Sequence, residues 1–105
     1  MDAVTVVMCT APEAEAPAMA DQLLRENLVA CVNLVGPVVS RYWWQGQIES
    51  GKEILLLMKT ARESVQQLRQ RVAELHSYDV PEILEFHADA GLPAYLAWVT
   101  GVCKG

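Results

Sequence analysis

No stretch of this sequence approaches the ~18 apolar residues that a membrane-spanning helix requires, so we expect no membrane partner. Basic clusters are also missing: 8 Lys and Arg are scattered among 13 Asp and Glu, and the net charge is −5. We therefore expect no nucleic-acid partner. The three cysteines, Cys9, Cys31 and Cys103, are odd in number and widely spaced, which does not suggest a disulfide framework. Cysteines used in this way fit a reducing cytoplasm. The opening residues 1–4 lack the basic region of a signal peptide, and we expect a cytoplasmic protein.

Recognisable catalytic motifs are absent as well. The chain has only two histidines, and we find no Ser/His/Asp set, no paired carboxylates with a cleft and no glycine-rich phosphate loop. Neither a CxxC nor an HxxxH spacing occurs, so the residues alone give only a weak indication of metal binding. The sequence therefore predicts a protein that is not an enzyme.

What the chain has in excess is apolar side chains. They make up 52% of 105 residues, above a usual share of roughly 45–50%, whereas charged residues make up only 20%. The length predicts one domain over residues 1–105. Because lipid is excluded as the partner, the surplus apolar surface is expected to pack against other subunits.

Periodicity and turn residues predict the order β-α-β-β-α-β followed by a terminal helix. The expected elements are a strand over 3–9, a helix from Ala16, a strand over 30–44 bent at Gly36-Pro37, a turn at Gln45-Gly46, a strand over 47–59, a helix that begins in a capping box over 60–63 and ends near His76, a strand over 79–87 and a helix over 92–99. With right-handed crossovers, this order gives an α+β, ferredoxin-like split βαβ fold with an antiparallel sheet. Both main helices are expected on one face of that sheet.

Two strands are apolar on both faces. Residues 4–8 contain only Thr5 as a polar break, and residues 54–58 contain none, although the face of a sheet without helices should alternate with polar residues. Tyr42, Trp43 and Trp44 add three consecutive aromatic residues near the hairpin tip. A closed ring of subunits would bury these surfaces; the alternative is a monomer with an unusually large core.

Several segments, in this order and spacing, resemble the CutA divalent-cation tolerance family. They are Met8-Cys9-Thr10, Ala30-Cys31-Val32-Asn33, residues 42–49, residues 55–60, residues 76–82 and residues 95–98. The resemblance covers nearly the whole chain and implies a homotrimer. It also implies association with copper and other divalent cations, and no settled enzymatic activity.

The resemblance identifies Cys9 and His76 as candidate metal ligands. Here Ser77 stands where the family has proline, and Leu75 stands where some members have a second histidine. Topology places the end of the first strand and the end of the second helix at the same end of the domain, and thiolate with imidazole suits copper or zinc. The alternatives are a buried structural cysteine and a histidine that interacts with the helix dipole.

A second candidate site combines aromatic and charged residues of the hairpin: Tyr42, Trp44, Glu53 and Lys59. If hairpins line clefts between subunits, these side chains could bind a small anion or metabolite; the alternative is a structural ion pair between subunits. Three functions therefore stay open: a copper-binding tolerance protein, a small-molecule sensor that resembles the trimeric PII signalling proteins, and a scaffold whose effect on metals is indirect.

Overall fold

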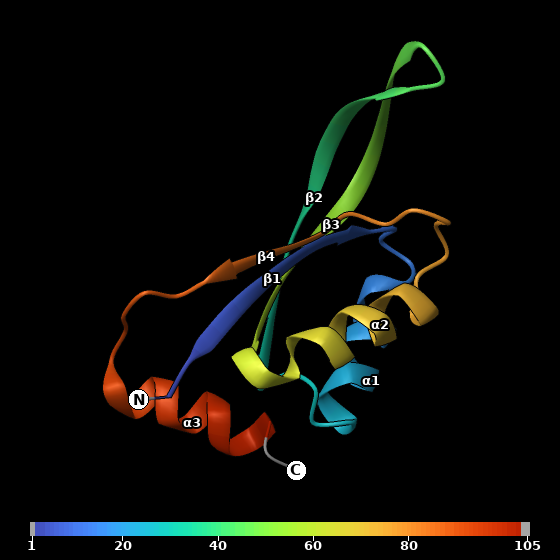
Figure 1. Ribbon diagram of the computed structural model, residues 1–105. Coiled ribbons are helices and arrows are strands. Elements are labelled where there is room, and N and C mark those ends of the chain that lie inside the picture. Colours follow the sequence, from blue (N-terminus) through green and yellow to red (C-terminus); the bar gives the residue numbers. More distant parts are fainter. Residues whose placement is uncertain (1, 104–105) are drawn as a thin grey trace.

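The computed structural model describes residues 2–103, and residues 1, 104 and 105 lie outside this part (Figure 1). Its elements in chain order are β1 (Val4–Ala11), α1 (Ala16–Arg25), β2 (Cys31–Trp44), β3 (Gln47–Ala61), the short 3-10 helix η1 (Arg62–Ser64), α2 (Val65–Leu75), β4 (Ile83–His87) and α3 (Pro93–Cys103). The predicted order of elements is confirmed. Pro17 lies in the first turn of α1, where its missing N–H costs no helical hydrogen bond.

The four strands form one antiparallel sheet in the order β2-β3-β1-β4. Each of the two βα units returns to the same sheet with one strand between its ends, which is the ferredoxin-like split βαβ topology. The predicted fold class is therefore confirmed. Strands β1 and β3 occupy the centre of the sheet.

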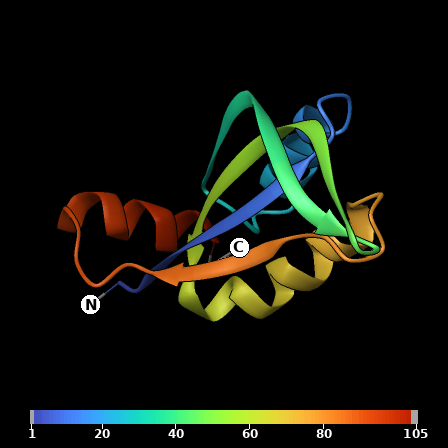
Figure 2. The same cartoon turned by 90° about the horizontal axis from the view of Figure 1, so that it is seen from above.

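Helices α1 and α2 pack side by side on one face of the sheet (Figure 1). The core lies between these two helices and the sheet. It contains alternate residues of the central strands, such as Val7 and Cys9 of β1 and Leu56 and Met58 of β3. Helix α3 lies apart from this helix pair (Figure 2) and packs Leu96 and Val99 against Val4 and Ala30. No helix within residues 2–103 is long and apolar enough to span a bilayer.

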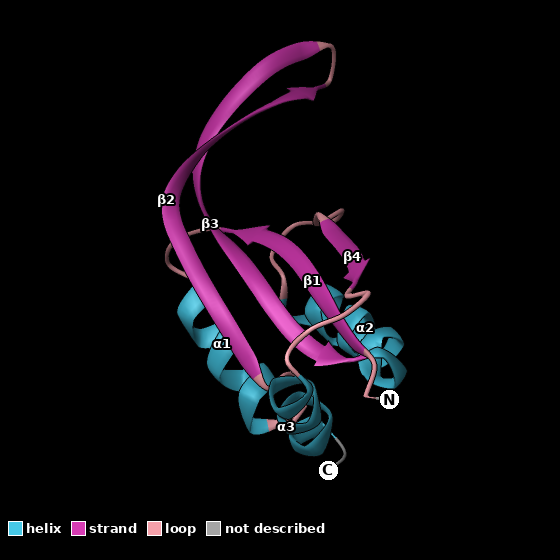
Figure 3. Cartoon of the chain, turned by 90° about the vertical axis from the view of Figure 1, so that its left-hand side faces the viewer, coloured by secondary structure: helices cyan, strands magenta, loops and turns pink. Residues whose placement is uncertain are grey.

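The β2-β3 hairpin projects far beyond the other two strands (Figure 3), and the molecule measures 45 Å in its longest dimension but 26 and 22 Å in the others. The tip of the hairpin is the predicted turn, where Gln45 and Gly46 have φ values of 50° and 79°. That left-handed pair gives the backbone twist that a two-residue hairpin turn requires. The predicted bend is a bulge between Val35 and Val38, with Gly36 at φ 142°.

The predicted capping box over residues 60–63 is wrong. Strand β3 continues to Ala61, and the Thr60 hydroxyl donates to the Leu28 carbonyl oxygen at 2.7 Å instead of capping a helix. Helix α2 begins after η1, and its N-cap residue Ser64 makes no side-chain capping hydrogen bond. A buried tertiary hydrogen bond has therefore outweighed the local capping pattern.

The fourth strand is shorter than predicted, and the terminal helix is longer. Residues 79–82 form a loop between α2 and β4, because β4 begins only at Ile83. Pro81 therefore lies outside the sheet, as its missing N–H favours. Helix α3 extends to Cys103, four residues beyond the prediction.

Candidate functional site

A groove of about 790 Å³ lies between the hairpin and the loop that joins α2 to β4. We call it the hairpin groove, and its lining residues are Thr10, Ser40, Arg41, Tyr42, Trp44, Glu53, Tyr78, Asp79, Val80, Pro81 and Glu82. The length of the hairpin creates it, since β2 and β3 continue past the end of β1 and leave one side facing the loop (Figure 3). A concave surface with aromatic walls and a few polar groups is typical of ligand sites.

Glu53 lies deepest among the charged groups of the groove, with only 8% of its surface exposed. The Tyr78 hydroxyl donates a hydrogen bond to its Oε2 atom over 2.9 Å. Burial, and then the Glu53 carboxylate, raise the pKa of Tyr78 to about 12, because both disfavour a phenolate. Tyr78 is therefore a neutral donor that fixes the position of the carboxylate.

Cys9 and His76, the predicted metal ligands, lie together beside the groove. The Cys9 thiol donates to the Thr10 carbonyl oxygen at 3.5 Å, and His76 Nε2 lies 2.7 Å from the same oxygen. His76 Nδ1 accepts the backbone N–H of Tyr78 at 3.1 Å. A backbone N–H can only donate, so Nε2 carries the imidazole proton.

These two side chains do not form an open metal site. Cys9 is fully buried, and burial, followed by the carboxylates of Glu82 and Glu53, raises the pKa of its thiol to about 12. Only the thiolate is a good metal ligand, and both nitrogens of His76 are already hydrogen-bonded. Within residues 2–103, no group of three or more His, Cys, Asp or Glu side chains is placed to hold a metal ion.

Of the predicted hairpin cluster, the structure brings three members into the groove and leaves out the fourth. Tyr42, Trp44 and Glu53 line the groove. Lys59 lies six residues beyond Glu53 on β3. Because a strand rises ~3.3 Å per residue, Lys59 is about 20 Å from Glu53. Its ammonium group is 4.0 Å from the sulfur of Cys31.

Sequence reasoning missed Tyr78 and the loop that follows it, because residues 79–82 were assigned to a strand. The run of Tyr78, Asp79 and Glu82 around a proline is the pattern that could have indicated an exposed loop with functional side chains. Arg41 was missed as well; its position on β2 places it at the groove.

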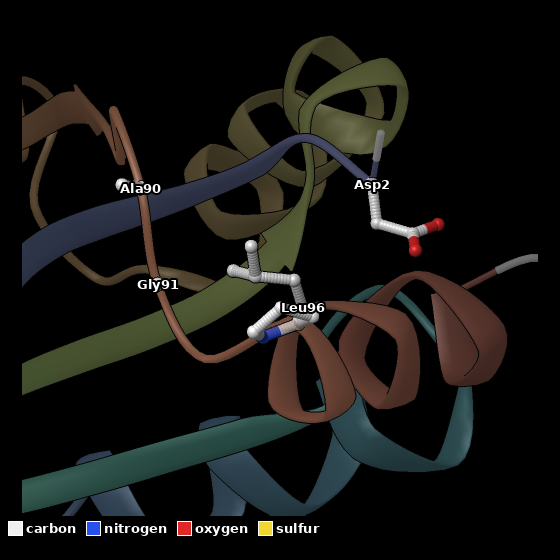
Figure 4. Close-up of a pocket in the computed structure, with 5 residues that line it drawn as sticks. Asp2, Ala90, Gly91 and Leu96 are labelled. Carbon is white, nitrogen blue, oxygen red and sulfur yellow. The ribbon is translucent and has the colours of Figure 1, made fainter.

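A second hollow, of about 210 Å³, lies between the start of the chain and α3 (Figure 4). It is lined by Asp2, Ala90, Gly91, Pro93 and Leu96. A Cβ atom at Gly91 would lie 3.1 Å from Leu96 Cδ2, so glycine permits the close approach of this loop to α3. Asp2 accepts a hydrogen bond from Thr100, and among the described residues no Ser, Thr, Cys, Lys or His side chain and no aromatic ring lines this hollow. We therefore place the candidate function in the hairpin groove.

The fold and the groove define a small ferredoxin-like protein with a long hairpin and a groove beside it. A comparison with protein-family models matches residues 5–102 to the CutA1 divalent ion tolerance protein family. The chain belongs to this family, which confirms the resemblance found in the sequence.

Individual relatives agree with this assignment. The divalent-cation tolerance protein CutA of Thermus thermophilus is 42% identical, over 90% of this chain and 92% of that protein. The chloroplastic protein CutA 1 of Oryza sativa is 38% identical over 90% of this chain, which spans about half (54%) of that longer protein. Among solved structures, the PII-like protein CutA from Nostoc in its apo form is 36% identical and superposes with a TM-score of 0.91, covering 94% of this chain and 96% of that one.

The buried thiol predicts a loss of stability in alkali. The pKa of Cys9 rises from the ordinary value of 9.0 to about 12 in the folded protein, so only the unfolded state releases this proton between those values. Its contribution to stability is complete below pH 9 and is lost as pH rises toward 12, by at most about 1.4 kcal/mol per pH unit.

Urea unfolding at about pH 8 and about pH 10.5 measures this loss. Cys9→Ala should reduce the difference between the two free energies of unfolding, although it removes a buried side chain at both pH values. Tyr78 titrates in a neighbouring range in both proteins, so the comparison isolates the thiol. An equal difference in the variant and the wild type would contradict the assignment.

Proposed function

We propose that this protein acts in tolerance to divalent metal ions as a homotrimer without catalytic activity, and that it binds a soft metal such as copper through Cys9 and His76. Membership of the CutA1 family supports the general role. The observation that carries the metal proposal is the single carbonyl oxygen of Thr10, toward which both the thiol and the imidazole Nε2 point. A metal ion that replaced these two protons would meet a thiolate and an imidazole together.

This site would be weak at neutral pH. The thiol must lose a proton that burial and two nearby carboxylates retain. Coordination at Nε2 also moves the imidazole proton to Nδ1, which removes the hydrogen bond from the Tyr78 backbone N–H. Two protein ligands are few for copper or zinc, so water or a neighbouring subunit would complete the coordination.

Metal binding should therefore strengthen as pH rises. Release of one thiol proton increases the apparent affinity by about tenfold per pH unit below the pKa. Titration calorimetry with copper, at two pH values about one unit apart, measures this slope for the wild type, Cys9→Ala and His76→Ala. Cys103→Ala is a matched control, since that thiol lies on α3. Unchanged affinity in both Cys9→Ala and His76→Ala would remove the proposed site.

The homotrimer is supported by the face of the sheet that α1 and α2 do not cover. It carries apolar side chains on all four strands, namely Val6, Met8, Val35, Leu55, Leu57, Leu84 and Phe86, and the polar side chains of Thr10, Asn33 and Lys59 lie among them. Phe86 is 52% exposed and Leu84 is 47% exposed in one chain. Burial of one such side chain contributes about 1.5–3 kcal/mol, so association of several copies removes a large unfavourable surface. The number three rests on the family resemblance.

Light scattering of the wild type at micromolar concentration should give three chain masses. Phe86→Glu places a charge in the shared face and should shift the protein toward single chains, because an unpaired buried charge is strongly unfavourable. Leu24→Glu is the control, since Leu24 lies on α1, on the opposite side of the sheet. A compact, folded single chain in the wild type would overturn the homotrimer.

A second candidate function is the binding of a small molecule in the hairpin groove. Its volume of about 790 Å³ and its walls of Tyr42, Trp44 and Tyr78 support it, as does the similarity to a protein described as PII-like. The aromatic rings supply apolar contact area, and Glu53 and Arg41 supply polar groups that orient a ligand.

A thermal-shift screen with nucleotides, amino acids and amines tests this candidate. At least one compound should raise the melting temperature of the wild type, since a ligand that binds only the folded state stabilises it. The same compound should have a smaller effect on Trp44→Leu than on Trp43→Leu, because Trp43 does not line the groove. A screen without any shift would count against a small-molecule role.

A further inference from the structure

The hairpin groove carries an excess of negative charge. Among the described lining residues, Glu53, Asp79 and Glu82 contribute three carboxylates to its walls, against the single guanidinium of Arg41. Their field reaches neighbouring groups, since Glu82 and Glu53 add to the burial that raises the pKa of Cys9. A ligand that enters this groove therefore meets a potential that favours positive charge.

Glu53 lacks a positively charged partner. Only 8% of the surface of this residue is exposed, yet no Lys, Arg or His nitrogen lies within 4.0 Å of its carboxylate anywhere in residues 2–103. The Tyr78 hydroxyl is its hydrogen-bond donor, and a phenol does not neutralise the charge. A buried carboxylate without a counter-charge is costly, so a cation bound beside it would be stabilised.

The aromatic walls distinguish between kinds of cation. Tyr42 and Trp44 are alternate residues of β2 and present their rings on the same side of the hairpin, with 46% and 55% of their surfaces exposed in one chain. Aromatic faces attract organic ammonium groups. A divalent metal ion prefers several oxygen ligands in one shell, and the described residues contain no such cluster.

We propose that the hairpin groove binds a small organic cation, with its ammonium group beside Glu53 and its alkyl groups against Tyr42 and Trp44. This inference rests on the second candidate function, since it names the class of small molecule that the groove accepts. The same chemistry could come from a Lys or Arg side chain of a neighbouring copy, and the experiment separates the two sources.

Titration calorimetry of the assembled protein with tetraethylammonium chloride should give saturable binding. Glu53→Gln should weaken it by about tenfold, as expected for the loss of one close charge partner. The amide of this variant keeps an oxygen that accepts the Tyr78 hydroxyl, so the groove should keep its shape, and an unchanged melting temperature checks this. Glu63→Gln is the matched control, because Glu63 is exposed at the other end of β3.

The contribution of the aromatic rings to cation binding is measured by substituting two adjacent tryptophans separately. Trp44→Leu should weaken binding of tetraethylammonium by about tenfold, whereas Trp43→Leu should leave it unchanged, since Trp43 lies outside the groove lining. Light scattering on each variant establishes that assembly is intact.

Three results would overturn the inference. They are an absence of saturable binding, equal binding by Glu53→Gln and the wild type, and binding that occurs only in the dissociated Phe86→Glu chain. The third result would assign the groove to a side chain of a neighbouring copy. A neutral or anionic compound that binds through Trp44 while tetraethylammonium does not would refute the cation and leave the small-molecule function standing.

Discussion

The constraint on which this structure depends is a sheet that is apolar on both faces, although the helix pair α1 and α2 covers only one face and α3 packs only against one end of the other. The inner residues of β1 and β3 pack under α1 and α2 and form the core. The outer residues of the same strands are not covered by α1 and α2, and Leu57 and Met8, which lie opposite each other across the central pair, are only partly buried in one chain. Because successive side chains of a strand alternate in direction, the apolar character of one strand stabilises both the fold and the association of chains.

The long hairpin follows from the same pattern. Strands β2 and β3 pair over a length that β1 and β4 do not reach, so no strand of the described chain lies beside the distal half of the hairpin. Aromatic residues there would be an exposed and sticky edge in a single chain. One side of the hairpin faces the loop between α2 and β4, and the hairpin groove lies between the two.

Much of the fold could be predicted because local and tertiary preferences agree there. The apolar central strands, Pro17 in the first turn of α1 and the Gln45-Gly46 turn are all set by nearby residues. Predictions failed where a hydrogen bond to a residue distant in the sequence determines the local structure. Thr60 donates to Leu28 instead of capping a helix, and Tyr78 reaches Glu53, which lies 25 residues earlier in the chain. The pairing of Tyr78 with Glu53 is set by the tertiary structure, so the groove could be predicted only in part.

The two candidate sites are linked through electrostatics. Thr10 belongs to both, since it lines the groove and its carbonyl oxygen accepts the hydrogen bonds of Cys9 and His76. Burial contributes most to the raised pKa of Cys9, but Glu82 and Glu53 add to it. A cation beside Glu53 would offset part of that field and lower the pKa of the thiol, but a divalent metal that replaced the thiol proton would add a net positive charge near the same carboxylates and repel that cation. By thermodynamic reciprocity, a metal thiolate at Cys9 would change the affinity of the groove for its cation by the same factor.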